Sequence, residues 1–490
     1  MKRFLLDTGL LWKNRPSRRP LILRGARQVG KTHLVRELAR AAFEHFIEVN
    51  FEESSALAPL FRSKDPAIIC ELLADKYSTP IVDGRTLLFL DELQAAEPYV
   101  LESLRYFREK RPGLHVVAAG SLLEFMLEGP GRERKKNFPM PVGRVEYMFV
   151  PPMNFEEFLL ATERDGLVDW LRRYRAGDDA PDALHEELLL WLRRYLAIGG
   201  MPAAVDAYVS GDILETERSL ESILATYRDD FPKYAGRVPT ARLRKVFDAV
   251  PAMLGEKLVY DRIDRGERAR DLAEAFETLR LARVVAKVRQ TPANGIPLGF
   301  GASDDDFKPL FLDVGLASRS LGLKLVDYME DGDALLQNQG GVCEQFVGQH
   351  LLHSGAEYEE PTAFCWRREA RNASAEVDYI LACGRTPIPV EVKAGTTGSL
   401  KGLHVFLAEK GRRFAVRLNA GKPSWMPAAR VKDVLGRPIE FDLLSLPLYL
   451  VCQLPRLVRE VLLDPPSHAI RPGSRLDGHS SSRKKGFPLT

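Results

Sequence analysis

Length, composition and charge exclude several classes of protein. The chain has 490 residues, 45% of them hydrophobic and 28% charged, which predicts a globular protein of several domains. Its formal net charge is only +3, so any nucleic-acid contact must come from a local patch. The five cysteines form no CxxC pair, which argues against a zinc ribbon or a disulfide framework and favours reduced thiols in the cytoplasm. Neither a signal peptide nor an apolar stretch long enough to span a bilayer is present, so we expect no membrane contact.

A glycine-rich loop near the N-terminus is the first strong motif. The sequence GARQVGKT, residues 25–32, follows an apolar run at 21–23 and precedes a segment with helical spacing. Phosphate binding needs this order of strand, loop and helix, because the loop and the helix N-terminus direct backbone N–H groups at the phosphate oxygens. We expect ATP and Mg²⁺ here, with Lys31 on the β- and γ-phosphates and Thr32 on the metal. The predicted nucleotide-binding residues are Gly25, Ala26, Arg27, Gln28, Val29, Gly30, Lys31 and Thr32.

Acidic and polar residues follow the next two predicted strands. The apolar run at 87–90 suits a parallel strand buried on both faces, and it ends in Asp91 and Glu92. We expect Asp91 to hold the Mg²⁺ shell and Glu92 to polarise the attacking water. A third strand, in LHVVAAG, is followed by Ser121. This serine is either a sensor of the γ-phosphate or an ordinary helix N-cap.

Several stretches of the chain resemble one known family. GARQVGKT, LLFLDELQ, AAGSLLEF and PVGRVEYMFVPPMNFEEFL are similar to AAA+-type P-loop ATPases that carry a C-terminal domain of unknown function. The similarity continues through YLAIGGMPAAV and KPLFLDVGLA to LLSLPLYLV. The first two stretches occur in P-loop NTPases in general, whereas GRVEYMFVPPMNFEEF and GGMPAAV narrow the resemblance to this family. It implies an ATPase core, a helical lid, a winged-helix-like segment and a nuclease-like C-terminal module.

The resemblance also directs attention to Arg144, in PVGRVEYMF. Related ATPases place an arginine after the sensor strand to touch a γ-phosphate, often across a subunit interface, which allows a homo-oligomer. The alternative is a surface ion pair with Glu146 or another neighbour. A basic loop at 132–136 precedes Arg144, and it either contacts a phosphate backbone or is simply solvated.

The middle of the chain changes character near residue 237. Residues 154–235 show amphipathic helical spacing, which suits a lid over the nucleotide. Residues 240–330 predict helices followed by a hairpin that turns at Asn294-Gly295, an order compatible with a winged helix. Its first helix carries a modest basic face of Arg242, Arg244 and Lys245, which either contacts DNA or is solvated.

A second set of chemical residues lies in the C-terminal third. Glu344 stands on an amphipathic helix, Asp378 on a predicted strand, and Glu391 and Lys393 on one face of the next strand. This arrangement resembles the PD-(D/E)xK nuclease core, with Asp378 and Glu391 as Mg²⁺ ligands and Lys393 orienting or deprotonating water. The alternatives are a plain hairpin with solvent-facing charges and a nuclease fold that only binds its partner.

The predicted fold class is α/β: a P-loop AAA+-type core with a helical lid, a winged-helix-like segment and a restriction-endonuclease-like domain. The expected function is an ATP-hydrolysing protein that couples nucleotide state to a nucleic-acid-binding or Mg²⁺-dependent nuclease-like module. The alternative is a nucleotide-dependent switch whose module only binds a protein or nucleic-acid partner. The expected boundaries are 1–152 for the core, 153–236 for the lid, 237–330 for the winged-helix-like domain, 331–464 for the nuclease-like domain and 465–490 for a disordered basic tail.

Overall fold

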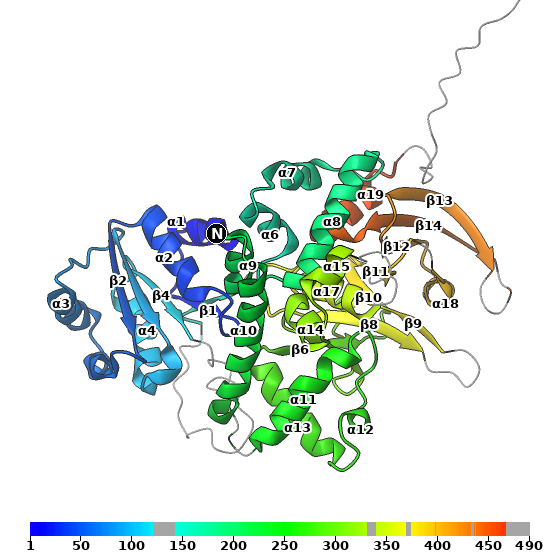
Figure 1. The fold of residues 1–490 in the computed structure, drawn as a ribbon. Coiled ribbons are helices and arrows are strands. Elements are labelled where there is room, and N and C mark those ends of the chain that lie inside the picture. The colour runs from blue at the N-terminus through cyan, green and yellow to red at the C-terminus, as the bar shows by residue number, and fades with distance from the viewer. Residues whose placement is uncertain are drawn as a thin grey trace, which may run out of the picture.

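The structure is a computed structural model of the whole chain, shown in Figure 1. It describes residues 1–120, 143–234, 236, 238–330, 340–368, 374–396, 398–432, 436 and 438–466. Ser121, the basic loop at 132–136 and most of the predicted tail lie outside the described residues. In the part of the chain that is described, no helix is both long and apolar enough to cross a membrane.

A parallel five-stranded sheet forms the N-terminal part, in the order β2-β3-β4-β1-β5. All described residues of β1, β3 and β4 are buried, as expected for strands covered on both faces. The strands are β1 (Leu21–Arg24), β2 (His45–Asn50), β3 (Thr86–Asp91), β4 (His115–Ala119) and β5 (Glu146–Phe149). The helices around them are α1 (Leu5–Asn14), α2 (Lys31–Ala42), α3 (Pro66–Tyr77) and α4 (Pro98–Lys110), with the 3-10 turns η1 (Ser55–Arg62) and η2 (Leu93–Ala95).

A helical segment follows the sheet and runs through the centre of the molecule (Figure 1). It consists of α6 (Phe155–Ala161), α7 (Asp165–Arg173), α8 (Asp182–Ile198), α9 (Pro202–Val209) and α10 (Ile213–Tyr234). Between α8 and α9, Gly199 and Gly200 allow close approach to other segments. A Cβ on Gly200 would lie 1.9 Å from the carbonyl oxygen of Met153, and one on Gly199 would lie 1.9 Å from Asp313 Oδ1. The two glycines are therefore required where these segments meet.

The next segment begins with helices and ends in two paired strands. Its elements are α11 (Thr240–Ala249), η3 (Val250–Met253), α12 (Tyr260–Ile263), α13 (Ala269–Leu281), β6 (Val285–Gln290), β7 (Phe307–Phe311), α14 (Val314–Ser320) and α15 (Leu325–Glu330). The strands β6 and β7 are antiparallel, as the predicted hairpin requires. The predicted tight turn at Asn294-Gly295 is wrong, because residues 291–306 connect the strands. This long connection is held by Thr291, whose hydroxyl donates to the Leu298 carbonyl oxygen at 2.6 Å.

The C-terminal part contains mixed sheets and continues the sheet of the preceding segment. A four-stranded sheet has the order β7-β6-β8-β9, with β6 and β8 parallel, and a five-stranded sheet has the order β10-β11-β12-β14-β13. The helices are α17 (Gly340–Leu352), α18 (Lys401–Lys410) and α19 (Leu454–Leu463), and η4 (Leu448–Gln453) precedes α19. The strands are β8 (Ala363–Arg368), β9 (Ala375–Val377), β10 (Tyr379–Cys383), β11 (Thr386–Val392), β12 (Phe414–Asn419), β13 (Ser424–Lys432) and β14 (Pro438–Pro447).

His350 joins the C-terminal helix α17 to the start of α6. Its Nδ1 lies 2.7 Å from the Phe346 carbonyl oxygen, and its Nε2 accepts from the Phe155 N–H at 3.1 Å. A ring that donates with one nitrogen and accepts with the other is neutral. Burial lowers the pKa of His350 from 6.5 to about 4. Protonation would remove the acceptor for Phe155, so this contact requires the neutral ring.

We predict that the contact at His350 makes the protein less stable in acid. Between pH 6.5 and about 4 the unfolded chain binds a proton that the folded ring excludes, so stability falls as the pH falls. One such proton contributes about 1.4 kcal/mol per pH unit. His350→Gln should flatten the dependence of the melting temperature on pH between 7 and about 5, measured by thermal denaturation. His33→Gln, on the exposed side of α2, is the matched control, and an equal slope in wild type and His350→Gln would contradict the prediction.

Candidate functional sites

The glycine-rich loop lies at the carboxyl end of β1, before α2. Gly25 must be glycine, because a Cβ there would lie 2.3 Å from the Val150 carbonyl oxygen. Gln28 and Gly30 adopt left-handed backbone conformations, with φ of 63° and 91°. The helix α2 then begins at Lys31, so its free N–H groups face the loop. This is the geometry that binds phosphate groups.

Lys31, Thr32 and Asp91 come together at this end of the sheet. The Thr32 hydroxyl donates to Asp91 Oδ2 at 2.8 Å, and the Lys31 ammonium donates to the carbonyl oxygens of Gly25 and Ala26 at 3.0 and 2.7 Å. Burial raises the pKa of Asp91 to about 6. A hydroxyl beside a carboxylate, next to a phosphate loop, suits Mg²⁺, which takes oxygen ligands and substrate phosphates.

Glu92 follows Asp91 in a left-handed backbone conformation, with φ of 52°. Its N–H donates to Asp91 Oδ1 at 2.9 Å, and its carboxylate accepts from the Gln94 side-chain amide. Non-glycine residues rarely adopt this conformation, and when they do, they are often found at functional sites. The two acids have different partners, since Asp91 accepts from the Thr32 hydroxyl and Glu92 from the Gln94 amide.

Residues far away in the sequence hold the outer side of the loop, and sequence reasoning missed them. The Arg3 guanidinium donates to the Val29 carbonyl oxygen at 2.9 Å, and the Tyr227 hydroxyl donates to the Arg27 carbonyl oxygen at 2.5 Å. The Arg27 side chain pairs with Asp230 at 2.7 Å. Both Tyr227 and Asp230 lie on α10, so the helical segment contacts the loop directly. The sequence offered one sign of these contacts, since both polar side chains lie on the apolar side of an amphipathic helix.

Arg144 lies at the other end of the sheet. It precedes β5, whose first residue, Glu146, pairs with Leu21 at the start of the parallel strand β1, whereas the glycine loop follows the end of β1. Its Nε donates to Glu109 at 3.0 Å. Arg144 therefore forms a surface ion pair, as the alternative interpretation expected, and its partner is Glu109. Within the same chain it lies at the opposite end of the sheet from the glycine loop.

The predicted C-terminal residues converge where β10 and β11 meet α17. Asp378 lies between β9 and β10, and its Oδ2 accepts from the Val392 N–H at 2.8 Å. The Lys393 ammonium lies 2.6 Å from Glu391 Oε1, which confirms that these two side chains share a face. Glu344 reaches the same cluster from α17 through a shared partner, Lys308.

Lys308, on β7, is the residue of this cluster that sequence reasoning missed. Its ammonium lies 2.9 Å from Glu344, 3.1 Å from Glu376 and 3.3 Å from Asp378. Burial disfavours its charge, but the carboxylates, Glu344 first, outweigh burial and raise the pKa of Lys308 well above its usual value. The sequence offered one sign of this cluster, since Lys308 stands in the run FKPLF, and every residue of that strand is buried. A buried lysine requires paired acids.

The fit of a metal to this cluster can be judged from its donors. Burial raises the pKa of Glu344 and of Glu391, because each loses water near other carboxylates. Such carboxylates need cations, and two lysines supply them here. Among the described residues, no group of three His, Cys, Asp or Glu side chains is arranged to hold a metal ion. The predicted Mg²⁺ at Asp378 and Glu391 does not fit while Lys308 stays in this position.

The basic face of α11 is largely neutralised within the protein. Arg242 pairs with Glu267 at 2.9 Å, and Lys245 pairs with Asp264 at 2.7 Å. These acids lie on the loop after α12, next to α11. Two of the three predicted basic residues therefore offer less charge to DNA than the sequence suggested.

Comparisons with protein families agree with the geometry of the glycine loop. A family model described as an AAA domain matches residues 17–159. The chain carries an AAA-type P-loop ATPase domain. Two family models described as domains of unknown function, DUF8612 and DUF4143, match residues 189–327 and 339–422. No curated protein matches the chain.

Solved structures give distant likenesses only. The Walker-type ATPase PABY2304 of Pyrococcus abyssi is 15% identical with a TM-score of 0.41, over 65% of this chain and 95% of that one. PCH-2 of C. elegans is 11% identical with a TM-score of 0.23, over 41% and 58%. The STAND protein PH0952 of Pyrococcus horikoshii, which has a tetratricopeptide repeat sensor, is 11% identical with a TM-score of 0.24, over 72% and 45%. At these scores the likenesses carry no argument.

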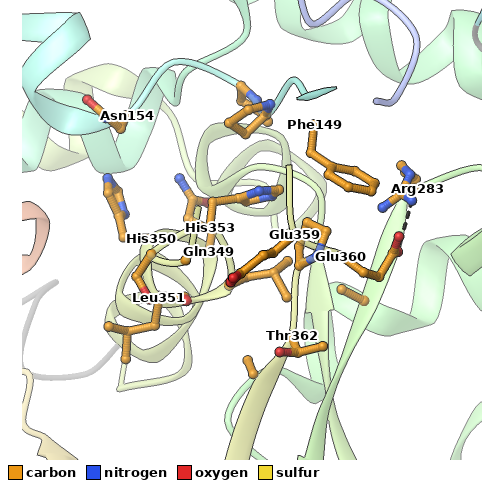
Figure 2. A pocket seen from close by; sticks show the side chains of 18 of the residues that line it. Phe149, Asn154, Arg283, Gln349, His350, Leu351, His353, Glu359, Glu360 and Thr362 are labelled. Atoms are coloured by element: carbon orange, nitrogen blue, oxygen red, sulfur yellow. Dashed lines mark hydrogen bonds and ion pairs between the residues drawn. The ribbon is translucent and has the colours of Figure 1, made fainter. Parts of the chain in front are cut away.

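The AAA domain and the C-terminal part meet beside a cavity of about 1200 Å³. Glu360 pairs with Arg24, the last residue of β1, at 3.4 Å. It also pairs with Arg283 at 2.9 Å, as Figure 2 shows. The N–H of Phe149, at the end of β5, donates to the Glu357 carbonyl oxygen at 2.8 Å. Arg24 directly precedes the glycine loop, so the segment before β8 contacts the AAA domain next to its phosphate site.

We predict that Tyr227 supports nucleotide binding through the Arg27 carbonyl. In Tyr227→Phe the Arg27 carbonyl oxygen loses its hydroxyl donor, so we expect the loop to be held less firmly in the conformation that binds phosphate. A lost hydrogen bond of about 1 kcal/mol should weaken binding about fivefold. The Kd of a fluorescent ADP analogue measures this effect. Tyr208→Phe, which changes a tyrosine of α9, is the control, and equal Kd values for all three proteins would refute the role of Tyr227.

Proposed function

We propose that the protein binds and hydrolyses ATP with Mg²⁺ at the AAA domain. In this proposal residues 25–32 bind the phosphates, Thr32 and Asp91 hold the metal, and Glu92 orients the attacking water. The observation that carries the proposal is the Thr32–Asp91 contact at 2.8 Å beside the glycine loop. Mg²⁺ would neutralise charge on the phosphates. The Lys31 ammonium, which donates to two loop carbonyl groups in this structure, would donate to the phosphates instead when ATP binds.

We further propose that nucleotide state is coupled to the C-terminal part as a nuclease-like module that acts on nucleic acid. In this proposal Glu344, Asp378, Glu391 and Lys393 are the functional residues, and the segment 237–330 is a winged-helix-like connector. The proposal is supported by the convergence of these four side chains and by the Glu360 bridge to Arg24. The protein would act in the cytoplasm. Ser121 and Arg144 would sense the nucleotide, and Arg144 would do so from a neighbouring subunit.

A second candidate function is a nucleotide-dependent switch whose C-terminal module binds nucleic acid or protein without cutting it. One observation favours it: the Lys308 ammonium lies on the carboxylates that a nuclease would offer to a metal. Cleavage of single- and double-stranded DNA and RNA with Mg²⁺ or Mn²⁺, with and without ATP, separates the two. Cleavage that Asp378→Ala abolishes supports the nuclease, whereas binding without cleavage supports the switch.

The ATPase assignment predicts different defects for two variants. Glu92→Gln should bind ATP as tightly as wild type but lose at least about a hundredfold in turnover, because it no longer activates water. Lys31→Ala should lose nucleotide binding itself, because it removes the ammonium that neutralises the β- and γ-phosphates. Phosphate release and nucleotide Kd measure the two effects.

The control for these variants is Glu97→Gln, which removes an exposed carboxylate just before α4. It should hydrolyse ATP like wild type. Unchanged phosphate release from Glu92→Gln would remove Glu92 from the mechanism. Retained tight binding by Lys31→Ala would count against the phosphate loop itself.

A further inference from the structure

Lys308 is held in place by its strand as well as by its charge. It lies on β7, where it pairs with Val288 of β6, and only 1% of its surface is exposed. Every residue of β7 is buried. Lysine is almost never fully buried unless it is paired, since an unpaired charge in a buried site is strongly destabilising. Its carboxylate partners are therefore part of the native arrangement.

Three carboxylates share this one ammonium. Glu344 comes from α17, whereas Glu376 on β9 and Asp378 just after β9 come from one stretch of chain, so two separate segments direct acids at one point. The ammonium donates hydrogen bonds to Glu344 at 2.9 Å and to Asp378 at 3.3 Å, and it forms an ion pair with Glu376 at 3.1 Å. Oxygens from separate segments around one central cation are also what a hard metal ion requires.

Two further cations pair with the acids of the cluster. Arg367 pairs with Glu376 from the far side, and Lys393 pairs with Glu391. Within the described residues, Glu391 Oε2 is buried and has no hydrogen-bond partner, and the whole residue is only 6% exposed. An unsatisfied buried carboxylate oxygen is costly. This oxygen would be stabilised by a further hydrogen-bond donor.

We propose that the Lys308 ammonium is the resident cation of this carboxylate cluster and stands where a divalent metal would have to bind. The inference rests on the second candidate function, the switch whose C-terminal module binds without cutting, and it excludes a metal-dependent nuclease at this cluster. While Lys308 stays in place, the module holds no Mg²⁺ or Mn²⁺ and therefore works as a binding platform. A divalent ion cannot join it, since two cations a few ångströms apart repel strongly in a buried site. Removal of the ammonium leaves Glu344, Glu376 and Asp378 without their shared cation and free to bind another.

The experiment measures Mn²⁺ binding by the full chain without nucleotide, from the EPR signal of free Mn²⁺. Wild type and Asp378→Asn should bind the same amount of Mn²⁺, because the cluster of the wild-type protein holds none. Lys308→Met, which removes the charge and keeps an unbranched side chain one atom shorter, should gain one site at least tenfold tighter than any Asp378-dependent binding in wild type. The double variant Lys308→Met/Asp378→Asn should lose that site, and Mn²⁺ should raise the melting temperature of Lys308→Met alone.

The matched control is Lys287→Met, which removes another paired lysine of the same sheet, on β6, bound to Glu277. It should gain no Mn²⁺ site. Mn²⁺ bound by wild type and lost in Asp378→Asn would overturn the proposal, and this comparison does not depend on how Lys308→Met folds. A folded Lys308→Met without an added site would overturn it too. ATP hydrolysis is measured in parallel, so a failure of the ATPase proposal shows in a different signal.

Discussion

The outer carbonyl groups of the glycine loop set a constraint on which the rest of the molecule depends. A loop that directs its N–H groups at phosphate must turn its carbonyl groups outward, and buried carbonyl groups need donors. Arg3 supplies one for Val29, and Tyr227 supplies one for Arg27. Neither donor belongs to the motif, and Tyr227 lies 200 residues after Arg27. The nucleotide site is therefore complete only when the helical segment packs against the AAA domain.

Local sequence predicted the phosphate site well because its chemistry is local. Glycines, a preceding buried strand and a following helix suffice to form the loop at residues 25–32, and the structure has β1 and α2 in those places. Asp91 also lies where its strand predicted, since the carboxyl ends of parallel strands meet at one edge of the sheet. Asn294-Gly295 shows the opposite case. An Asn-Gly pair permits a tight turn but does not impose one, and here tertiary contacts select a longer connection.

The C-terminal cluster shows what a local pattern leaves out. Strand alternation was enough to place Glu391 and Lys393 on one face, and strand pairing brought Asp378 beside them. The alternation says nothing of Lys308, which lies 36 residues before Glu344 and on a different sheet from Glu391. Yet the need to pair every buried charge gives Lys308 its meaning. A strand with a single lysine among buried apolar residues predicts acidic partners somewhere, and only the fold identifies them.

In the proposed coupling, communication between the two sites would rest on backbone contacts more than on ion pairs. Glu360 is 51% exposed, so its pairs with Arg24 and Arg283 contribute at most about 1 kcal/mol each. The hydrogen bond from Phe149 to Glu357 is a main-chain contact between β5 and the segment that leads into β8. β8 pairs with β6, and β6 pairs with β7, which carries Lys308. A shift of β5 against the nucleotide loop would therefore reach Lys308 through successive paired strands, in which displacement of one strand displaces its neighbour.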